Sequence, residues 1–346
     1  MSGLSKKLGL MLGGLVVALI AAEIILRVIG FGVLTPDMSF GMNTRSALEQ
    51  GDFEPDGHLF WKLPLNQNPA FDQAIGAVHP DKPIRAKGNR ERVLVLGDSC
   101  SRLSFRSLPY SDALLIHLAG DTEVLNASVP GYTSHQGLAW WRHQLRDASP
   151  DVVVVYFGWN DHWRMTGWTD RLYARRISGW SPRLFALVEQ PADPPPLRVP
   201  PNEYRENLRD LVDGIRDAGG RAVLVVAPSS FTPEARRRLV DTGYLRPDDD
   251  VREIHEQYLD VVRSFAGEEN VSVLGADQVF RDLGSQIPLL QRDGIHLTDA
   301  AHHVLGALLA QTIRHGTGAD GQSSSELLGV ARAALGAAVR RAGEGS

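Results

Sequence analysis

The sequence predicts an α/β fold, a three-layer α/β/α sandwich around a doubly wound parallel sheet of about five strands. Short runs of β-favouring residues alternate with longer helical stretches from residue 92 onward. This alternation is typical of parallel strands joined by right-handed helical crossovers that cover both faces of the sheet. With 346 residues, of which 43% are hydrophobic, the chain can bury a sizeable core, and one domain is enough to hold every element.

The elements follow one another in regular order. Strands are expected at 93–96, 123–126, 152–157, 222–227 and 271–274. Helices are expected at 109–119, 135–147, 203–218, 251–266 and 298–315. The run Val93 to Leu96 is apolar throughout, which is typical of a strand buried on both faces. Gly219-Gly220 is a good end for the third helix.

The amino terminus resembles a membrane segment. Lys6 and Lys7 precede an uncharged run from Leu8 to Ala22, and apolar character continues to Leu34 around Glu23 and Arg27. About 20 residues span the hydrocarbon core. We therefore expect a single-pass anchor, with the lysines in the cytoplasm and the body of the protein outside it. The alternative is a cleaved signal peptide with its cleavage site at Ala21-Ala22.

Four segments are expected along the chain. They are an anchor at 1–34, an extended connector at 35–91 that packs on the domain through Phe60 and Trp61, the main domain at 92–315, and a linker with a C-terminal helix at 316–346. An insertion at 162–202 interrupts the main domain and carries Trp163, Trp168, Trp180 and several prolines. It can be a lid or substrate wall, or a semi-rigid spacer.

Charge and cysteine content limit the classes of function. The net charge of −5 implies no basic face and argues against nucleic-acid binding. Cys100 is the only cysteine, which excludes an intrachain disulfide and leaves a small half-buried side chain as its expected role. His302 and His303 lack partners at metal-ligand spacing, so no metal and no cofactor is expected.

Polar motifs follow three of the predicted strands and precede the last helix. They are Gly97-Asp98-Ser99, Asn126 to Gly131, Gly158-Trp159-Asn160-Asp161 and Asp293-Gly294-Ile295-His296. In open α/β sheets the ligand crevice lies at the carboxyl ends of the strands. A serine there is a weak nucleophile that needs an adjacent base, and a histidine held by a carboxylate is the recurrent solution.

With these motifs in this order, the chain resembles the SGNH/GDSL hydrolase superfamily over residues 92–315. The signature positions are Ser99, Gly131, Asn160 and His296, and Pro201 to Leu208 resembles a helix opening of membrane-anchored members. The resemblance implies the flavodoxin-like fold of that superfamily. It also implies a triad of Ser99, Asp293 and His296, with an oxyanion hole made by the Ser99 and Gly131 N–H groups and the Asn160 amide. Supporting positions are Gly97, Asp98, Gly158 and Asp161, of which the two aspartates are expected to hold their loops.

The implied activity is that of a serine esterase that works through an acyl-enzyme. An outer, membrane-tethered position fits O-acetyl or other short acyl groups on an envelope or exported glycan, which are removed or transferred. Lipid or acyl esters are the alternative substrate. A non-catalytic glycan-binding component of an envelope complex, with partners in that complex, is the alternative from another class.

Overall fold

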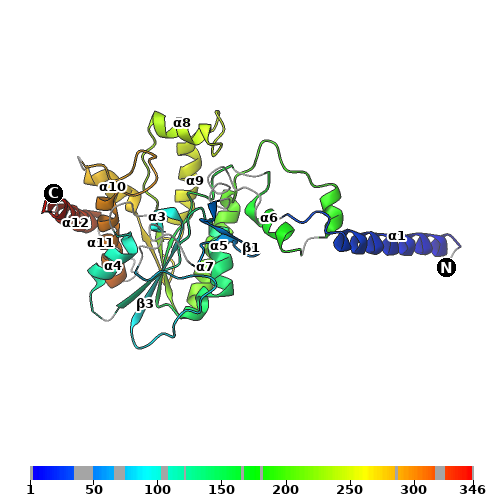
Figure 1. Cartoon of the computed structure of the whole chain (residues 1–346), viewed down its shortest axis with the longest axis horizontal. Coiled ribbons are helices and arrows are strands. Elements are labelled where there is room, and N and C mark those ends of the chain that lie inside the picture. Colours follow the sequence, from blue (N-terminus) through cyan, green and yellow to red (C-terminus); the bar gives the residue numbers. More distant parts are fainter. Residues whose placement is uncertain are drawn as a thin grey trace.

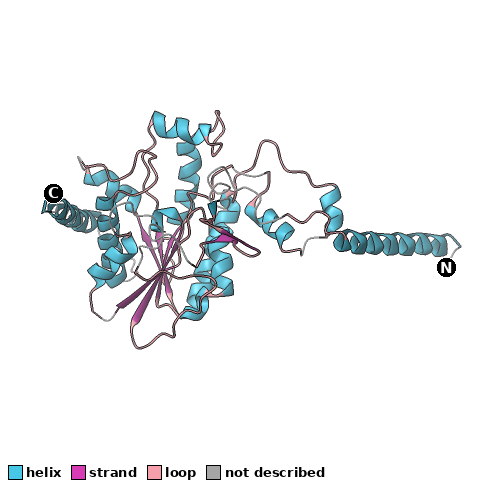
Figure 2. Cartoon of the chain, in the orientation of Figure 1, coloured by secondary structure: helices cyan, strands magenta, loops and turns pink. Residues whose placement is uncertain are grey.

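A five-stranded parallel sheet forms the centre of the protein, and helices cover both of its faces (Figures 1 and 2). This computed structural model describes residues 3–34, 50–65, 75–102, 108–120, 122–164, 167–179, 182–284, 287–315 and 324–344. The strands are β3 (Glu91–Gly97), β4 (Thr122–Asn126), β5 (Val152–Tyr156), β6 (Arg221–Val225) and β7 (Val271–Leu274). Each lies within two residues of a predicted strand, so the predicted α/β fold is confirmed.

The order of the strands creates a crevice at one edge of the sheet. The order is β4-β3-β5-β6-β7, and every neighbouring pair is parallel. The chain leaves β3 toward β4 on one side and returns to β5 on the other. The carboxyl ends of β3 and β5 therefore form the switch point where open α/β sheets bind ligands. The pairing of Gly97 with Tyr156 brings these two strand ends together.

Helices form the outer two layers. On one face lie α5 (Ser134–His143), α7 (Pro201–Asp217) and α9 (Val251–Arg263), which pack side by side. On the other face lie α4 (Tyr110–Leu118) and α11 (Asp299–His315), and α12 (Ser324–Glu344) covers α11 from outside. The predicted C-terminal helix therefore has partners, and Ala331 and Ala334 are its buried residues.

Several short helices were missing from the prediction. They are α3 (Ser99–Arg102), α6 (Asp170–Ile177), α8 (Pro233–Asp241) and α10 (Ala276–Leu283). Side-chain caps start two of them, since Thr169 accepts from the Leu172 N–H and Thr232 from the Ala235 N–H. The Thr232-Pro233-Glu234 sequence is a helix-start signal that the periodicity alone did not reveal. The helix predicted at 135–147 ends at His143, and a 3-10 turn, η1 (Leu145–Ala148), follows it.

The segment before β3 contributes to the core. A hairpin of β1 (Glu54–Asp56) and β2 (Phe60–Lys62) places Phe60 and Trp61 at 0% exposure. Farther along, Ala77 pairs with Asn126 and extends the sheet beyond β4. Parts of the expected connector, residues 35–49 and 66–74, lie outside the described residues.

The insertion and the amino-terminal helix lie at the same end of the molecule (Figure 1). The insertion carries α6 and a 3-10 helix, η2 (Arg183–Leu187), and buries Trp163 and Trp168. Trp180 lies outside the described residues. Helix α1 (Gly3–Val28) extends away from the domain, and its Ser5–Val28 portion is long and apolar enough to cross a membrane.

Candidate active site

Ser99 lies at the switch point, immediately after β3. Gly97 ends the strand, and a Cβ there would lie 2.8 Å from the Tyr156 carbonyl oxygen, so the close approach of β5 requires glycine. Asp98 then begins the short helix α3, since its Oδ1 accepts from the Cys100 N–H at 2.8 Å. Ser99 is the first residue of α3 and is half-buried, which leaves its side chain at the crevice.

Ser99, His296 and Asp293 form a continuous hydrogen-bonded chain. The His296 Nε2 lies 2.9 Å from the Ser99 Oγ, and its Nδ1 lies 2.7 Å from the Asp293 Oδ2. Asp293 accepts a hydrogen bond from the His296 Nδ1–H, which leaves the Nε2 lone pair free to accept a hydrogen bond from the serine hydroxyl. The other oxygen of Asp293 accepts the backbone N–H groups of Ile295 and His296 and so fixes the loop.

Asp293 stays ionised in this setting. Burial raises its pKa, but the hydrogen bond and the charge of His296, together with the two backbone N–H groups, outweigh burial and lower the pKa below its usual value. A carboxylate at this position stabilises the imidazolium that forms when His296 takes a proton. The geometry and the charge therefore suit activation of the Ser99 hydroxyl.

Gly131 and Asn160 come to the same crevice from β4 and β5. Gly131 has a φ of +82°, and a Cβ there would lie 2.9 Å from the Trp61 ring, so both conformation and space require glycine. The Asn160 Nδ2 donates to the Asp98 Oδ2 and to the Tyr132 carbonyl, each at 3.1 Å. These two acceptors orient the amide and take both of its N–H groups, so one of the two bonds must open when the amide donates to an oxyanion.

Two buried carboxyl groups support the loops. Asp161 accepts the Ser134 N–H at 3.0 Å and the Gly158 N–H at 3.1 Å, and burial raises its pKa to about 7. Asp98 is fully buried, and burial raises its pKa to about 6 even though the Cys100 N–H and the Asn160 amide favour the charged form. Both side chains touch backbone or amide donors of the loops that carry Ser99 and Asn160.

Cys100 is not placed to act as a nucleophile. Its side chain is 1% exposed, more buried than expected, and its Sγ faces the Ile295 carbonyl at 3.8 Å. Burial, followed by the charge of Asp98, raises the pKa of the thiol well above its usual value. His162 is fully buried as well and lies against His255 rather than Ser99. In the described part of the chain, no group of three His, Cys, Asp or Glu side chains is arranged to hold a metal.

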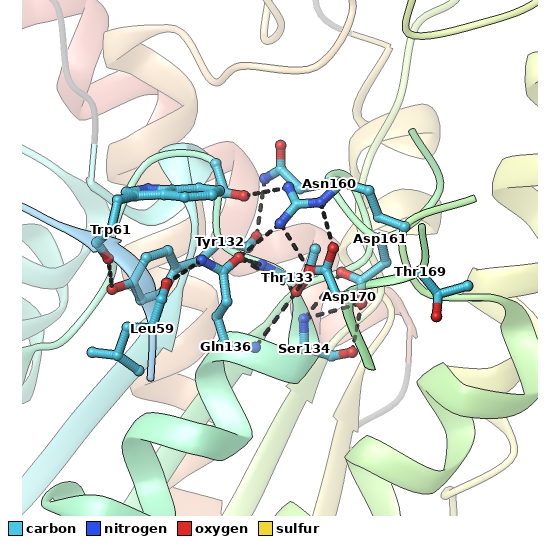
Figure 3. A network of polar contacts seen from close by, with 12 residues as sticks. Leu59, Trp61, Tyr132, Thr133, Ser134, Gln136, Asn160, Asp161, Thr169 and Asp170 are labelled. Carbon is cyan, nitrogen blue, oxygen red and sulfur yellow. Dashed lines mark hydrogen bonds and ion pairs between the residues drawn. The ribbon is translucent and has the colours of Figure 1, made fainter. Parts of the chain in front are cut away.

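Arg198, which sequence reasoning missed, holds the Gly131 loop from the insertion. Figure 3 shows its partners Gln136 and Asp170 in the network of polar contacts that includes Trp61. Its Nη1 donates to the Gly131 carbonyl at 2.7 Å, and its Nη2 donates to the Gln136 Oε1 at 2.8 Å. Its guanidinium also pairs with Asp170 at 2.8 Å, with side-chain exposures of 1% and 0%. A buried pair of this kind is stable only when its hydrogen bonds are satisfied, as they are here. No local pattern distinguishes Arg198 within its proline-rich stretch.

Trp61 holds the same loop from the N-terminal hairpin. Its Nε1 donates to the Pro130 carbonyl at 3.1 Å, and that carbonyl belongs to the same peptide plane as the Gly131 N–H. The Tyr132 hydroxyl donates to the Trp61 carbonyl at 2.6 Å, and the Arg198 guanidinium lies 5.4 Å from the centre of the indole ring. Trp61 therefore fixes the Pro130 carbonyl and Arg198 fixes the Gly131 carbonyl, so both peptide groups of Gly131 are held by side chains from distant segments.

One family model and several solved structures are similar to this chain. The GDSL-like lipase/acylhydrolase family matches residues 95–304. Similar solved structures include a lipase/acylhydrolase from Enterococcus faecalis, at 19% identity over 65% of this chain and 96% of that one, with a TM-score of 0.44. An α/β hydrolase from the metagenome of Lake Arreo in Spain is 22% identical over 65% and 96%, with a TM-score of 0.44.

A third similar structure is an acetylxylan esterase from Geobacillus stearothermophilus, at 20% identity over 62% of this chain and 90% of that one, with a TM-score of 0.43. Among curated proteins, none matches the chain. The family match covers more than half of the sequence, and the expected resemblance is thereby confirmed. The chain belongs to the GDSL-like lipase/acylhydrolase family and is an ester hydrolase of the SGNH/GDSL type.

Proposed function

We propose that the protein is a membrane-anchored serine esterase in which Ser99 is the nucleophile, His296 the general base and Asp293 the carboxylate that orients it. The observation that carries this proposal is the hydrogen-bonded chain from the Ser99 Oγ through His296 to Asp293, with distances of 2.9 and 2.7 Å. These distances lie within the reach that proton transfer in a nucleophilic mechanism needs.

The reaction has two steps. The Ser99 Oγ attacks the ester carbonyl carbon while His296 Nε2 takes the hydroxyl proton and then gives it to the leaving alcohol, which produces an acyl-enzyme. Water, or the hydroxyl of an acceptor, next attacks the acyl carbon with His296 as base, and Ser99 is released. The negative charge on the carbonyl oxygen is met by the N–H groups of Ser99 and Gly131 and by the Asn160 amide.

The substrate that we propose is an O-acetyl or other short acyl group on a glycan of the envelope or on an exported glycan. Support comes from the anchor helix at one end of the molecule and from Lys6 and Lys7 near its amino-terminal end, which favour a catalytic domain outside the cytoplasm. Transfer to another sugar hydroxyl in place of water uses the same two steps.

The catalytic assignment is tested with a fluorophosphonate probe and a chromogenic acetyl ester. Ser99→Ala is expected to abolish both labelling and hydrolysis, whereas Cys100→Ala, in the adjacent buried position, is expected to retain both. Full activity in a correctly folded Ser99→Ala protein would contradict the assignment of Ser99 as nucleophile. Absence of labelling in the folded wild type would favour a glycan-binding component.

Acyl specificity and anchoring need their own measurements. Rates on esters of graded chain length should fall steeply beyond the shortest acyl groups, and a maximum at long chains would favour the lipid-esterase alternative. The intact mass of the purified membrane protein should include residues 1–22, whereas a mass that begins after Ala22 would indicate a cleaved signal peptide.

A further inference from the structure

The insertion presents three exposed apolar side chains beside the anchor helix. Phe185, Leu187 and Val188, here called the η2 apolar patch, are 52%, 53% and 76% exposed. Single exposed apolar residues are ordinary on soluble proteins. Three exposed apolar side chains within four residues form a local apolar patch, and such a patch indicates a surface that contacts an apolar partner.

Polar contacts fasten η2 to the last turns of α1. The carboxylate of Glu23 accepts the Arg183 N–H at 2.9 Å and the Leu184 N–H at 3.1 Å. Arg27, which pairs with Glu23 at 2.7 Å, donates to the Gly179 carbonyl at 2.9 Å. The insertion is thus held against α1 by contacts at two successive turns of that helix.

Close packing adds to these contacts just after α1. Gly32 has a φ of +71°, and a Cβ there would lie 2.3 Å from the Ala186 Cβ, so the chain beyond the helix lies directly on η2. Figure 1 shows α1 leaving the molecule from this end, on the side of α6, while α4 and α12 lie at the opposite end. The η2 apolar patch therefore has a fixed place beside the exit of the anchor helix.

The length of α1 sets the depth of η2. Ser5–Val28 comprises 24 residues, about 36 Å of helix, against a hydrocarbon core of about 30 Å. A span that begins near Leu8 and takes about 20 residues ends near Arg27, so Glu23 and Arg27 lie at the outer boundary of the bilayer. A carboxylate at that depth is costly unless it is paired, and the η2 amides together with Arg27 supply its partners.

We propose that the η2 apolar patch inserts into the outer interface of the lipid bilayer that α1 spans. The inference rests on the membrane anchoring proposed above. The partner is a lipid surface, because η2 contacts the last turns of α1, where Ile24, Ile25 and Val28 are exposed, and therefore lies at the level of the outer end of the span. Arg198 belongs to the same insertion and donates to the Gly131 carbonyl. One segment would therefore contact both the membrane and the loop of the candidate oxyanion hole.

The test uses the full chain in vesicles of phosphatidylcholine and phosphatidylglycerol. Single cysteines carry an environment-sensitive fluorophore at Leu187→Cys and Val188→Cys in the patch, at Leu15→Cys inside α1, and at Ile116→Cys on α4. Leu187 and Ile116 are matched in exposure, at 53% and 52%, and the buried Cys100 should remain unlabelled, which the parent protein checks. Each labelled protein must hydrolyse a soluble acetyl ester at the parent rate.

Spin-labelled lipids are expected to quench the probes at 187 and 188 several-fold more strongly than the probe at 116, while aqueous iodide does the reverse. Quenching at 187 equal to that at 116, with strong quenching at 15, would overturn the patch inference alone. Loss of quenching at 15 would overturn the membrane anchoring and the inference with it. Shielding at 187 from both quenchers would indicate a covering protein, such as a second copy, and would also overturn it.

Discussion

Trp61→Phe isolates one hydrogen bond of the candidate oxyanion hole. Phenylalanine keeps an aromatic ring in a position that is 0% exposed but removes the Nε1 donor that lies 3.1 Å from the Pro130 carbonyl. That carbonyl and the Gly131 N–H belong to one peptide plane, so its release allows the N–H to tilt. Arg198 still holds the next carbonyl at 2.7 Å, which limits the tilt.

The expected effect falls mainly on kcat. A complete oxyanion donor contributes about 3 kcal/mol, and a tilted N–H keeps roughly half of its contribution, because hydrogen bonds weaken as they bend. The barrier should then rise by about 1.4 kcal/mol, which is about tenfold in kcat. KM should stay unchanged, because the oxyanion charge develops only in the transition state. Loss of the bond should also lower stability by about 1 kcal/mol.

The assay is hydrolysis of a chromogenic acetyl ester, with active sites counted by fluorophosphonate labelling. Trp140→Phe is the matched control, since Trp140 is 1% exposed and its Nε1 donates to the Gln144 Oε1 at 2.7 Å. It should lose a similar amount of stability and keep its kcat. Equal kcat in the two variants would refute the positioning role of Trp61.

Three further predictions follow from other contacts. Asp293→Asn should lower kcat by about 10⁴, measured on the same ester, and a loss below tenfold would contradict its role. Burial raises the pKa of Asp161 to about 7. Between about pH 4 and pH 7 this carboxyl is therefore protonated in the folded protein and ionised in the unfolded chain, so its contribution to the free energy of unfolding falls as the pH rises. Asp161→Asn lacks this titration, so its Tm relative to wild type should improve from about pH 4 to about pH 7, and a constant difference would contradict the assignment. Gly306→Ala should lower Tm, because its Cβ would lie 2.7 Å from the Ala113 Cβ and overpacking costs about 1–3 kcal/mol, more than the roughly 1 kcal/mol gained in helix propensity. Gly329→Ala, with nothing within 4 Å, is the control and should not lower Tm.

The central sheet was predictable because its signals are local. Val93 to Leu96 and Val152 to Val155 are apolar runs that only a strand buried on both faces explains well, and both are 2% exposed or less. The short helices α6 and α8 were missed because single threonine caps start them, and a cap is a weaker signal than apolar periodicity.

The residues of the candidate site also differ in how local their sequence signals are. Asp293 and His296 are three residues apart, and Ser99 follows a buried strand, so short motifs carried the candidate triad. Arg198 lies 67 residues from Gly131, and Trp61 lies 69 residues from Pro130. Neither residue has a local sequence pattern that indicates its partner. A buried polar side chain takes its partner from whichever segment the fold brings beside it.

By itself, the sequence determined the α/β class, the strand positions, the family and the candidate residues at the strand ends, because each depends on neighbours within a few positions. The tertiary structure alone decided how the Gly131 amide is held, since Trp61 reaches it from the hairpin before β3 and Arg198 from the insertion between β5 and β6. It also decided that the insertion joins the end of α1 through Glu23. The physical reason is that burial and hydrogen-bond satisfaction are properties of packed segments, and packing joins residues that are distant along the chain.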